Sequence, residues 1–207
     1  MKLTYFGAYG RAEPIRMLFD HAGVKYENNM IGFPELASLK ETGYLEFGQV
    51  PILEWKDGTV MSQSNAILRA CGIEFGYYPL GDMEKMWICD STLDALYDVF
   101  GPCAQTVFAP TNEAKAAALK TFVETILPPF LQRMDARLAG KLYFTGKLSI
   151  ADFAVGSFLS ATAYNSQFPH QKAVEGVVKS FKNVEAFYSN FAKVNEAHLK
   201  ARQPAFF

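Results

Sequence analysis

The sequence predicts a small α/β domain followed by an all-helical domain. Three observations lead to this fold class: residues 1–76 alternate between strand and helix periodicity, glycine and proline cluster at residues 76–81, and nearly all of the later sequence has helical periodicity. We expect the α/β domain at 1–76, a linker at 77–82 and the helical domain at 83–207. With 207 residues, 50% of them hydrophobic, the chain can bury an extensive core.

The first domain is expected to follow the order βαβαββα. Lys2–Phe6 alternates enough to form a strand, and a helix opens near Arg11, where Pro14 is tolerated because it lies within the first turn. Because a helix connects the first two strands, they should be parallel, with a right-handed crossover. The remaining elements are expected at 24–31 (strand), 33–40 (short or irregular helix), 52–55 and 59–61 (hairpin) and about 64–75 (helix).

The stretch Gly48–Arg69 combines three signals. Pro51 precedes an apolar run, as proline can at the first residue of a strand, and Asp57-Gly58 predicts a tight hairpin turn. The strand-to-helix junction at Ser64 leaves the first helical N–H groups free, which suits an anion. A peptide-like ligand with a free carboxylate would suit this junction and a strand edge at Val50. Alternatively, Pro51 only begins a strand and Ser64 only caps a helix.

Long helices are expected in the second domain. Met83 to about Phe108 forms the first, with a kink or break at Gly101-Pro102, and residues 113–138 form another, bent near Pro128-Pro129. Shorter helices are expected at 154–164, 171–179 and 184–193.

Residues 148–153 have the pattern of a capping box with a hydrophobic staple. Ser149 is the expected N-cap, Asp152 follows three residues later, and Leu148 and Phe153 flank them. Replacing Ser149 or Asp152 should cost about 1 kcal/mol or more of stability. The motif is a signal for folding and not for catalysis.

Composition argues against several kinds of partner. The formal net charge of −1 and pI of about 6.3 give no reason to expect nucleic acid or an anionic membrane. No apolar run reaches the length of a membrane span, and the first six residues do not resemble a secretory signal. The three cysteines and three histidines lack metal-binding spacing, so we expect a reduced, cytoplasmic setting and no metal site.

Four motifs in this order resemble the tyrosine-type cytosolic glutathione transferases, and the resemblance covers essentially the whole chain. They are Leu3–Phe6 followed by Gly10–Glu13, then Gly48–Pro51, then Gln63–Arg69, and in the second domain Gly146–Asp152. The first strand is most similar to the sigma class. Phe47–Pro51 and Gln63–Arg69 resemble the pi class at least as much.

The resemblance implies a thioredoxin-like domain that binds glutathione and a helical domain that supplies most of the second-substrate pocket. Tyr5 matches the family's catalytic tyrosine. A thiol with a pKa of about 8.5 is only a few per cent thiolate near neutral pH, and a neutral phenol can donate its O–H to the sulfur anion and favour it. Arg11 resembles an arginine near the tyrosine that lowers its pKa or steadies the thiolate. Alternatively, Arg11 is only a surface residue of the first helical turn.

Further glutathione contacts follow from the same resemblance. The proline that matches Pro51 is cis in this family, and the residue matching Val50 pairs through its backbone with the cysteinyl part of glutathione. Gln63 and Ser64 match the residues that hold the γ-glutamyl carboxylate. The other matching positions are Gln49, Lys40 toward the glycyl carboxylate, Phe33 where many members have tryptophan, and Asp98.

Asp98 matches a carboxylate that reaches glutathione in the neighbouring subunit, so the resemblance implies a homodimer. Asp90 and Asp94 share its helix face and could be only a solvated stripe. Phe47 stands where pi-class chains insert an aromatic residue into the partner, whereas sigma-like chains lack such a key. The candidates for the second-substrate pocket are Phe6, Tyr9, Phe100, Gln105 and Phe206, each of which could equally be a core or surface residue.

The expected function is conjugation of glutathione to small hydrophobic electrophiles, as in detoxification, with glutathione as co-substrate and no cofactor. The enzymatic alternative is a glutathione-dependent isomerase of the prostaglandin D synthase type, or a peroxidase. Prostaglandin-isomerising members carry a tryptophan near the position of Gln105, and its absence here argues against that activity. The third hypothesis is a non-catalytic or structural homologue such as a lens crystallin, against which Tyr5, Gln63 and Ser64 speak.

Overall fold

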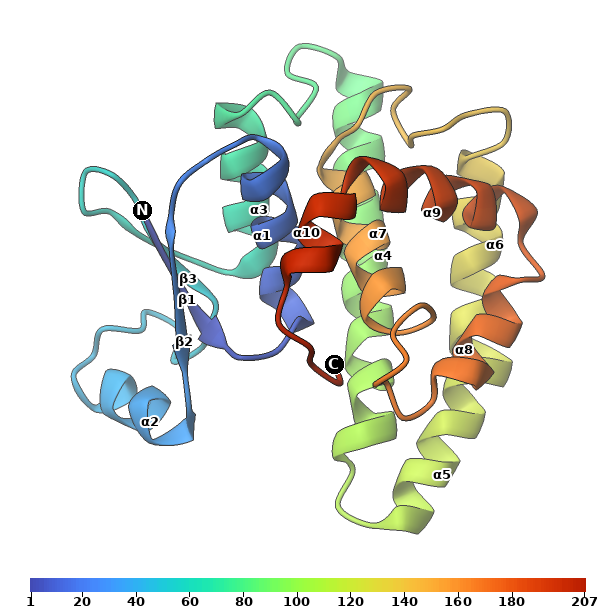
Figure 1. Cartoon of the computed structure of the whole chain (residues 1–207), viewed down its shortest axis with the longest axis horizontal. Helices are drawn as coiled ribbons and strands as arrows, with labels where there is room; N and C mark the ends of the chain where they lie inside the picture. Colours follow the sequence, from blue (N-terminus) through green and yellow to red (C-terminus); the bar gives the residue numbers. More distant parts are fainter.

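A computed structural model describes residues 1–207 (Figure 1). The first part of the chain forms one four-stranded sheet in the order β2-β1-β3-β4, so β2 and β4 are its edges. Its elements are β1 Lys2–Phe6, a 3₁₀ turn η1 Gly10–Ala12, α1 Glu13–His21, β2 Glu27–Ile31, α2 Phe33–Glu41, β3 Ile52–Glu54, β4 Val60–Ser62 and α3 Ser64–Glu74. The predicted element order is confirmed.

Strand pairing follows the connections between the strands. β1 pairs parallel with β2, with Tyr5 opposite Met30, as a helical crossover requires. β1 pairs antiparallel with β3, which forms the expected hairpin with β4. At the hairpin turn the backbone N–H of Thr59 donates to Asp57 Oδ1 at 2.9 Å, an interaction that favours this turn residue.

The second strand begins at Glu27 and not at Val24, because the end of α1 uses the intervening residues. Gly23 has a φ of +66°, a conformation that glycine adopts without steric cost. The N–H of Val24 then donates back to the carbonyl of Phe19 at 2.9 Å, as in a Schellman motif.

The rest of the chain is helical. Its elements are α4 Met83–Phe108, α5 Asn112–Thr121, the π-helical turn η2 Phe122–Ile126, α6 Leu127–Arg137, α7 Ile150–Ala161, α8 Gln171–Val178, α9 Lys182–Val194 and α10 Glu196–Ala201. Figure 1 shows α7 in the middle of this part, with α4 and α9 beside it. No helix of the structure is long and apolar enough to cross a membrane.

Prolines act differently in the two long helical stretches. The break expected at Gly101-Pro102 is absent, since α4 runs through Pro102; the adjoining side chains of Val99 and Cys103 are buried and hold the helix against its neighbours. The stretch predicted at 113–138 divides into α5 and α6, with η2 immediately before Pro128. Pro128 and Pro129 lack N–H groups, so the preceding turn cannot keep its usual hydrogen bonds.

The capping box at the start of α7 is confirmed and fully buried. Asp152 accepts hydrogen bonds from the Ser149 N–H (2.7 Å), the Ser149 hydroxyl (2.6 Å) and the Phe144 N–H (3.0 Å). Two glycines then allow close packing, because a Cβ on Gly72 of α3 would lie 2.3 Å from Ile150 and one on Gly156 would lie 2.4 Å from Phe191. Helix α7 is therefore held closely against both parts of the chain.

Candidate functional site

Tyr5 lies near the end of β1, with its side chain largely buried and its hydroxyl beside the following loop. That hydroxyl accepts a hydrogen bond from the backbone N–H of Arg11 at 3.2 Å. Gly10 makes this approach possible, because a Cβ there would lie 2.5 Å from the hydroxyl oxygen. The loop between β1 and α1 thus positions the phenol through backbone contacts.

The Tyr5 phenol is held in its neutral form. Burial raises the pKa of Tyr5, and the opposing effects of the Arg11 N–H and the charges of Arg11 and Arg16 do not overcome burial. A neutral phenol keeps its proton and can donate it in a hydrogen bond. Since the Arg11 N–H already occupies an acceptor position on the oxygen, the O–H is available to another acceptor, such as an anionic sulfur.

Next to this loop is a small, mostly polar cleft between the sheet and α3. Val50-Pro51 forms a cis peptide bond at its edge, as the resemblance implied. Neither the N–H nor the carbonyl of Val50 makes a backbone hydrogen bond, so this edge is open to an extended ligand. The residues lining the cleft are Arg11, Phe47, Gln49, Val50, Pro51, Ser62, Gln63 and Ser64.

Helix α3 begins at Ser64, which lines this cleft. Gln63, just before it, has a φ of +69° and a ψ of 109°, the only non-glycine residue with a positive φ. Such conformations cost about 1–3 kcal/mol and concentrate at functional sites. The strand edge at Val50 and the start of α3 at Ser64, which the sequence predicts to suit one ligand, therefore lie at the same cleft.

Three further predicted contacts lie outside the lining of the cleft. A Cβ on Gly48 would lie 3.9 Å from Cε of Lys40, so the lysine reaches the loop that carries Gln49. Phe33 is 78% exposed at the start of α2, and its ring contacts Phe6 with centroids 5.2 Å apart. Asp98 is exposed on α4 and has no partner within the chain.

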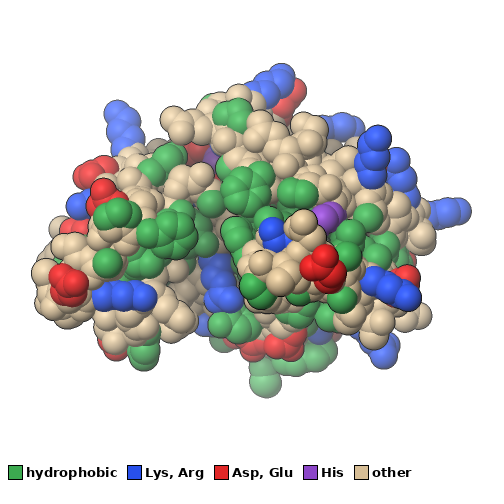
Figure 2. Space-filling model, turned by 90° about the horizontal axis from the view of Figure 1, so that it is seen from below, with side chains coloured by type: hydrophobic (Ala, Val, Ile, Leu, Met, Phe, Trp, Pro, Cys, Tyr) green, Lys and Arg blue, Asp and Glu red, His purple; other side chains and the backbone are tan.

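A second cavity adjoins the cleft and shares Arg11 and Ser64 with it. Its volume is about 40 Å³, and its walls are mostly apolar, from α4, α7 and the end of the chain. The guanidinium of Arg11 lies over the rings of Tyr97 (4.3 Å) and Phe100 (5.3 Å), so it is held by cation–π contacts at the junction of the two spaces. Figure 2 shows hydrophobic side chains on both sides of the hollow between the two lobes, with cationic side chains within it.

Of the five candidates for the second-substrate pocket, Phe100 lines this cavity and the other four do not. Phe6 packs on Phe33, Tyr9 lies beneath the end of the chain, and Phe206 is 47% exposed next to Phe108. Gln105 is exposed on another face of α4, opposite α5.

Sequence reasoning missed Phe207, which lines the second cavity. Its ring lies 5.3 Å from that of Phe100 and 5.9 Å from those of Phe108 and Phe168. The segment after α10 reaches this position because the Tyr9 N–H donates to the Phe207 carbonyl at 2.8 Å. We call residues 202–207 the C-terminal strap. The adjacent residues Phe206 and Phe207 indicate an aromatic contact at the end of the chain, but the sequence does not show which of the two rings points inward.

The structure also clarifies the acidic and metal-binding candidates. Asp90 is half-buried and bonds Arg69 (2.8 Å) and the Tyr78 hydroxyl (2.8 Å), so it connects α3 to α4 and is not part of a solvated stripe. Asp94 and Asp98 are exposed. No group of three histidine, cysteine or acidic side chains could hold a metal ion.

Comparison with known proteins gives one consistent family. Residues 1–69 match the model of the glutathione S-transferase N-terminal domain, and residues 97–198 match that of the C-terminal domain. The chain is 35% identical to hematopoietic prostaglandin D synthase of Gallus gallus over 73% of this chain and 74% of that protein. It is 33% identical to glutathione S-transferase alpha-2 of Rattus norvegicus, over 89% and 86%. The solved sigma class enzyme of Fasciola hepatica superposes with a TM-score of 0.81 and 24% identity, over 100% and 98%.

Proposed function

The chain belongs to the glutathione S-transferase family, and we propose that it conjugates glutathione to hydrophobic electrophiles with Tyr5 as the residue that stabilises the thiolate. The observation that carries this assignment is the hydroxyl of Tyr5, neutral and held by the Arg11 N–H beside an open cleft. Glutathione is the co-substrate, and no cofactor is invoked.

The role of Tyr5 is to favour the thiolate of bound glutathione. The phenol donates its O–H to the sulfur anion, which lowers the pKa of the thiol without transferring the phenolic proton. A fall of about two units corresponds to roughly 2.7 kcal/mol. The Arg11 guanidinium, at the junction of cleft and cavity, adds positive charge on the side from which the electrophile approaches. The thiolate then attacks an electrophilic carbon, and a thioether forms as the leaving group departs.

Glutathione would be held mostly by backbone. Its cysteinyl part pairs with the free N–H and carbonyl of Val50, beside the cis Pro51. Its γ-glutamyl carboxylate is bound at the start of α3 by Ser64 and Gln63, where helical N–H groups favour an anion. The remaining contacts would come from Gln49, from Lys40 to the glycyl carboxylate, and from Phe33, which has no indole N–H to donate.

The second cavity would take the electrophile, since it adjoins the cleft and has aromatic walls. We infer that residues 1–76 bind glutathione and that residues 83–207 provide most of the pocket for the electrophile. Phe6 and Phe206 lie outside its lining, next to Phe33 and Phe108 respectively, and Tyr9 would act only through the strap that it holds.

We infer a homodimer in which Asp98 of each subunit reaches the glutathione of the other. Asp98 is exposed and unpaired on α4, as this role requires. Large apolar side chains are also exposed: Trp87 (60%) and Tyr97 (48%) on α4, and Phe47 (56%) in the loop before β3. Exposed aromatic residues of this kind are typical of protein interfaces. We also propose that the chain is sigma-like, that it is located in the cytoplasm and that it acts in detoxification.

A second candidate function is glutathione-dependent isomerisation, supported by the 35% identity to the Gallus gallus prostaglandin D synthase. The position of Gln105 on an exposed face away from the second cavity gives this activity no support from the site. A peroxidase would use the same thiolate. A non-catalytic homologue is disfavoured because Val50 and Ser64 line an open cleft together with Arg11, whose N–H holds the Tyr5 hydroxyl.

The test is a substrate panel with purified enzyme and glutathione. A chloronitroarene should yield the thioether conjugate, at a rate that falls strongly in Tyr5→Phe. Prostaglandin H2 and an organic hydroperoxide separate the isomerase and peroxidase alternatives by their products. Normal conjugation by Tyr5→Phe would refute the role of the tyrosine, and glutathione binding without turnover of any substrate would favour the non-catalytic homologue.

A further inference from the structure

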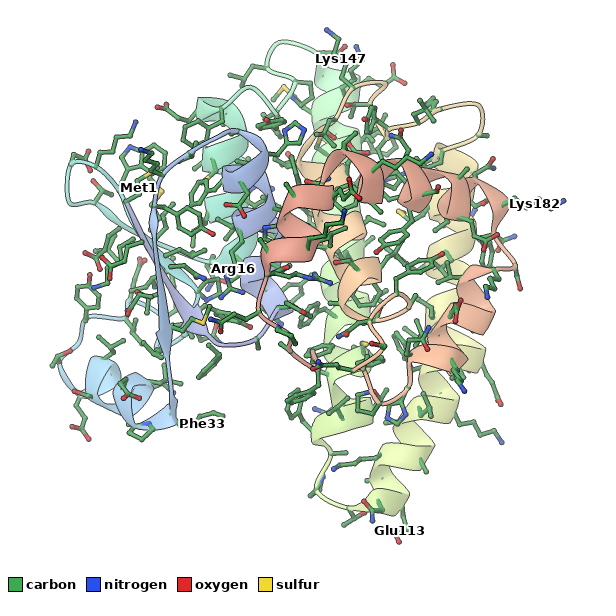
Figure 3. The ribbon with its side chains drawn as sticks, in the orientation of Figure 1. Met1, Arg16, Phe33, Glu113, Lys147 and Lys182 are labelled. Atoms are coloured by element: carbon green, nitrogen blue, oxygen red, sulfur yellow. The ribbon has the colours of Figure 1, made fainter.

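A buried arginine on α1 lies close to the Tyr5 phenol but outside both spaces proposed for the substrates. Arg16, labelled in Figure 3, extends from α1 toward β2 and the end of β1, and it is 6% exposed. The centre of its guanidinium lies 5.8 Å from the centroid of the Tyr5 ring. Arg16 lines neither the cleft between the sheet and α3 nor the second cavity, so any influence on the reaction must pass through other residues.

Every nitrogen of this guanidinium has a hydrogen-bond partner. Nη1 donates to the Ala8 carbonyl at 2.6 Å, Nη2 to the Phe6 carbonyl at 3.1 Å and Nε to Oδ1 of Asn28 at 3.1 Å. Nη1 also lies 3.4 Å from Oε2 of Glu13. Two of the partners are therefore backbone carbonyls of the segment that joins β1 to η1. The planar fork of arginine can bond two acceptors in a fixed arrangement, whereas lysine presents a single ammonium group.

Neutralising Glu13 does not account for these contacts. Glu13 is bonded by His198 and by Arg202, each at 2.9 Å, and both are closer to it than Arg16 is. The shortest bond of Arg16 goes instead to the carbonyl of Ala8, which receives no backbone N–H. The main attachment of Arg16 is thus to the segment after β1.

The segment held in this way determines where the hydrogen-bond partner of the phenol lies. Phe6 directly follows Tyr5, and Arg11, three residues after Ala8, donates its N–H to the Tyr5 hydroxyl at 3.2 Å. The stretch Gly7–Gly10 begins and ends with glycine, which adopts more backbone conformations than any other residue. Bonds to the two carbonyls restrict this freedom, and they do so without occupying the phenol itself.

We propose that Arg16 is a positioning residue for conjugation, because its bonds to the two carbonyls fix the Arg11 N–H relative to the Tyr5 hydroxyl. This role presupposes the proposed function, in which Tyr5 stabilises the thiolate. Arg16 touches no reacting atom. Without its fork the phenol keeps its proton but loses the fixed direction in which it donates, so the thiolate is less favoured while glutathione still binds in the cleft.

Titration of bound glutathione in the variant Arg16→Lys tests this role on the whole enzyme. The variant keeps a positive charge near Tyr5 and replaces the planar fork with a single ammonium group. We expect the acid dissociation constant of the bound thiol to fall about threefold to tenfold, the usual effect of losing one hydrogen bond, so the titration midpoint rises by about 0.5–1 pH unit. The dissociation constant of glutathione should change little, because no residue of the cleft is altered.

Two controls separate positioning from general destabilisation. Arg137→Lys makes the same change on α6, where the guanidinium donates to the hydroxyls of Thr92 (2.6 Å) and Ser91 (3.0 Å). It should lower stability in urea without moving the midpoint. In the Tyr5→Phe background, Arg16→Lys should cause no further rise of the midpoint, because its effect passes through the phenol.

Asn28→Ala is a second variant, which leaves Arg16 in place. Asn28 is exposed on the edge strand β2, so its truncation should not prevent folding. Loss of the acceptor for Nε should loosen the guanidinium and raise the midpoint in the same direction, by about 0.3 pH unit or roughly twofold in the acid dissociation constant.

Three results would overturn the role of Arg16. The first is a wild-type midpoint in folded Arg16→Lys or, where that variant does not fold, in Asn28→Ala. The second is an equal rise when Arg16→Lys is added to Tyr5→Phe, which would show that Arg16 does not act through the phenol. The third is an equal rise in Arg137→Lys, which would assign the effect to lost stability. A wild-type midpoint in Tyr5→Phe alone would instead refute the proposed function, and the role of Arg16 would fall with it.

Discussion

The hydroxyl oxygen of Tyr5 accepts a hydrogen bond from the backbone N–H of Arg11 at 3.2 Å. This relationship fixes the direction in which the phenol can donate, because one acceptor position of the oxygen is already occupied. The N–H belongs to a short 3₁₀ turn and does not depend on which side chain residue 11 carries. With Tyr5 in its proposed role, activation of the thiol would depend on the loop that follows β1, and side-chain changes elsewhere should affect it less than changes of this loop.

The first prediction concerns the phenol itself. In Tyr5→Phe the bound thiol should return to a pKa near 8.5, and kcat/KM at pH 6.5 should fall roughly 50-fold if the tyrosine lowers that pKa by about two units. The ultraviolet absorbance of the bound thiolate, followed against pH, measures the change directly. Glutathione affinity should change little, because the proposed binding contacts are made by Val50 and Ser64 and not by Tyr5. An unaltered titration midpoint would contradict this role.

A second prediction tests whether the position of the Tyr5 phenol, and not backbone strain, sets the pKa of the bound thiol. Gly10→Ala places a Cβ 2.5 Å from the Tyr5 hydroxyl oxygen, at a residue with a φ of +44°. We expect the ring or the loop to move and the pKa of the bound thiol to rise toward its free value. Gly23→Ala is the matched control, since its φ is +66° and no atom lies within 4 Å of the new Cβ.

Both glycine variants should lose stability by roughly 1 kcal/mol from the unfavourable φ. Only Gly10→Ala should lower the fraction of bound glutathione that is present as thiolate. Urea unfolding and the thiolate titration, measured on the same samples, compare the two effects. Equal loss of thiolate in both variants would mean that general destabilisation, and not contact with Tyr5, is responsible.

The third prediction concerns the size of the electrophile. Phe207 lines the second cavity beside Phe100, and the volume of this cavity is about 40 Å³. Phe207→Ala should enlarge this space, lower KM for bulky electrophiles and raise it for small ones that lose contact with the ring. Phe206→Ala removes the same group from a 47% exposed position and should change the ratio of the two KM values less. Kinetics with a chloronitroarene and a larger homologue measure this ratio; equal shifts in the two variants would exclude a special role for Phe207.

Local sequence signals brought together the two features that line the cleft between the sheet and α3. Pro51 before an apolar run and Ser64 at a helix start each predict a backbone feature, and both features lie in one cleft. The capping box of Ser149 and Asp152 was equally readable, because its partners are three residues apart. What these motifs share is that the interacting groups are near one another in sequence.

Features that depend on distant parts of the chain were not predictable in this way. Glu13 and Arg16 lie on the polar side of an amphipathic pattern, yet both are buried. α10 and the strap contact Glu13, and the loop after β1 binds Arg16 through its carbonyl groups. Phe207 meets the second cavity only because Tyr9, almost 200 residues earlier, bonds its carbonyl. Gln63 has a positive φ that its residue type does not signal, since the surrounding structure imposes it.

The ion network of Glu13, His198 and Asp20 gives the last prediction, a dependence of stability on pH. His198 has a folded pKa above its ordinary 6.5, so its stabilising contribution is complete below pH 6.5 and is lost as pH rises through the folded pKa. Burial disfavours the charge of Glu13, but its bonds to His198 and Arg202 prevail and lower its pKa below the ordinary 4.5. Its contribution is present above pH 4.5 and is lost as pH falls through the folded pKa. The network should therefore stabilise the chain most between about pH 4.5 and 6.5.

His198→Gln keeps a polar side chain but removes the charge from between the two carboxylates. At pH 6 this variant should lose about 1.5–3 kcal/mol of unfolding free energy, the usual contribution of a hydrogen bond to a charged group. The loss should be smaller at pH 9, because the contribution of the histidine charge declines as pH rises through the folded pKa. Urea unfolding at the two pH values and one protein concentration measures both differences. His21→Gln serves as the control, because burial lowers the pKa of His21 and its removal should not reduce the decline of stability above pH 6.5. A loss in His198→Gln that is the same at both pH values would show that packing, and not the charge between Glu13 and Asp20, holds α10 against α1.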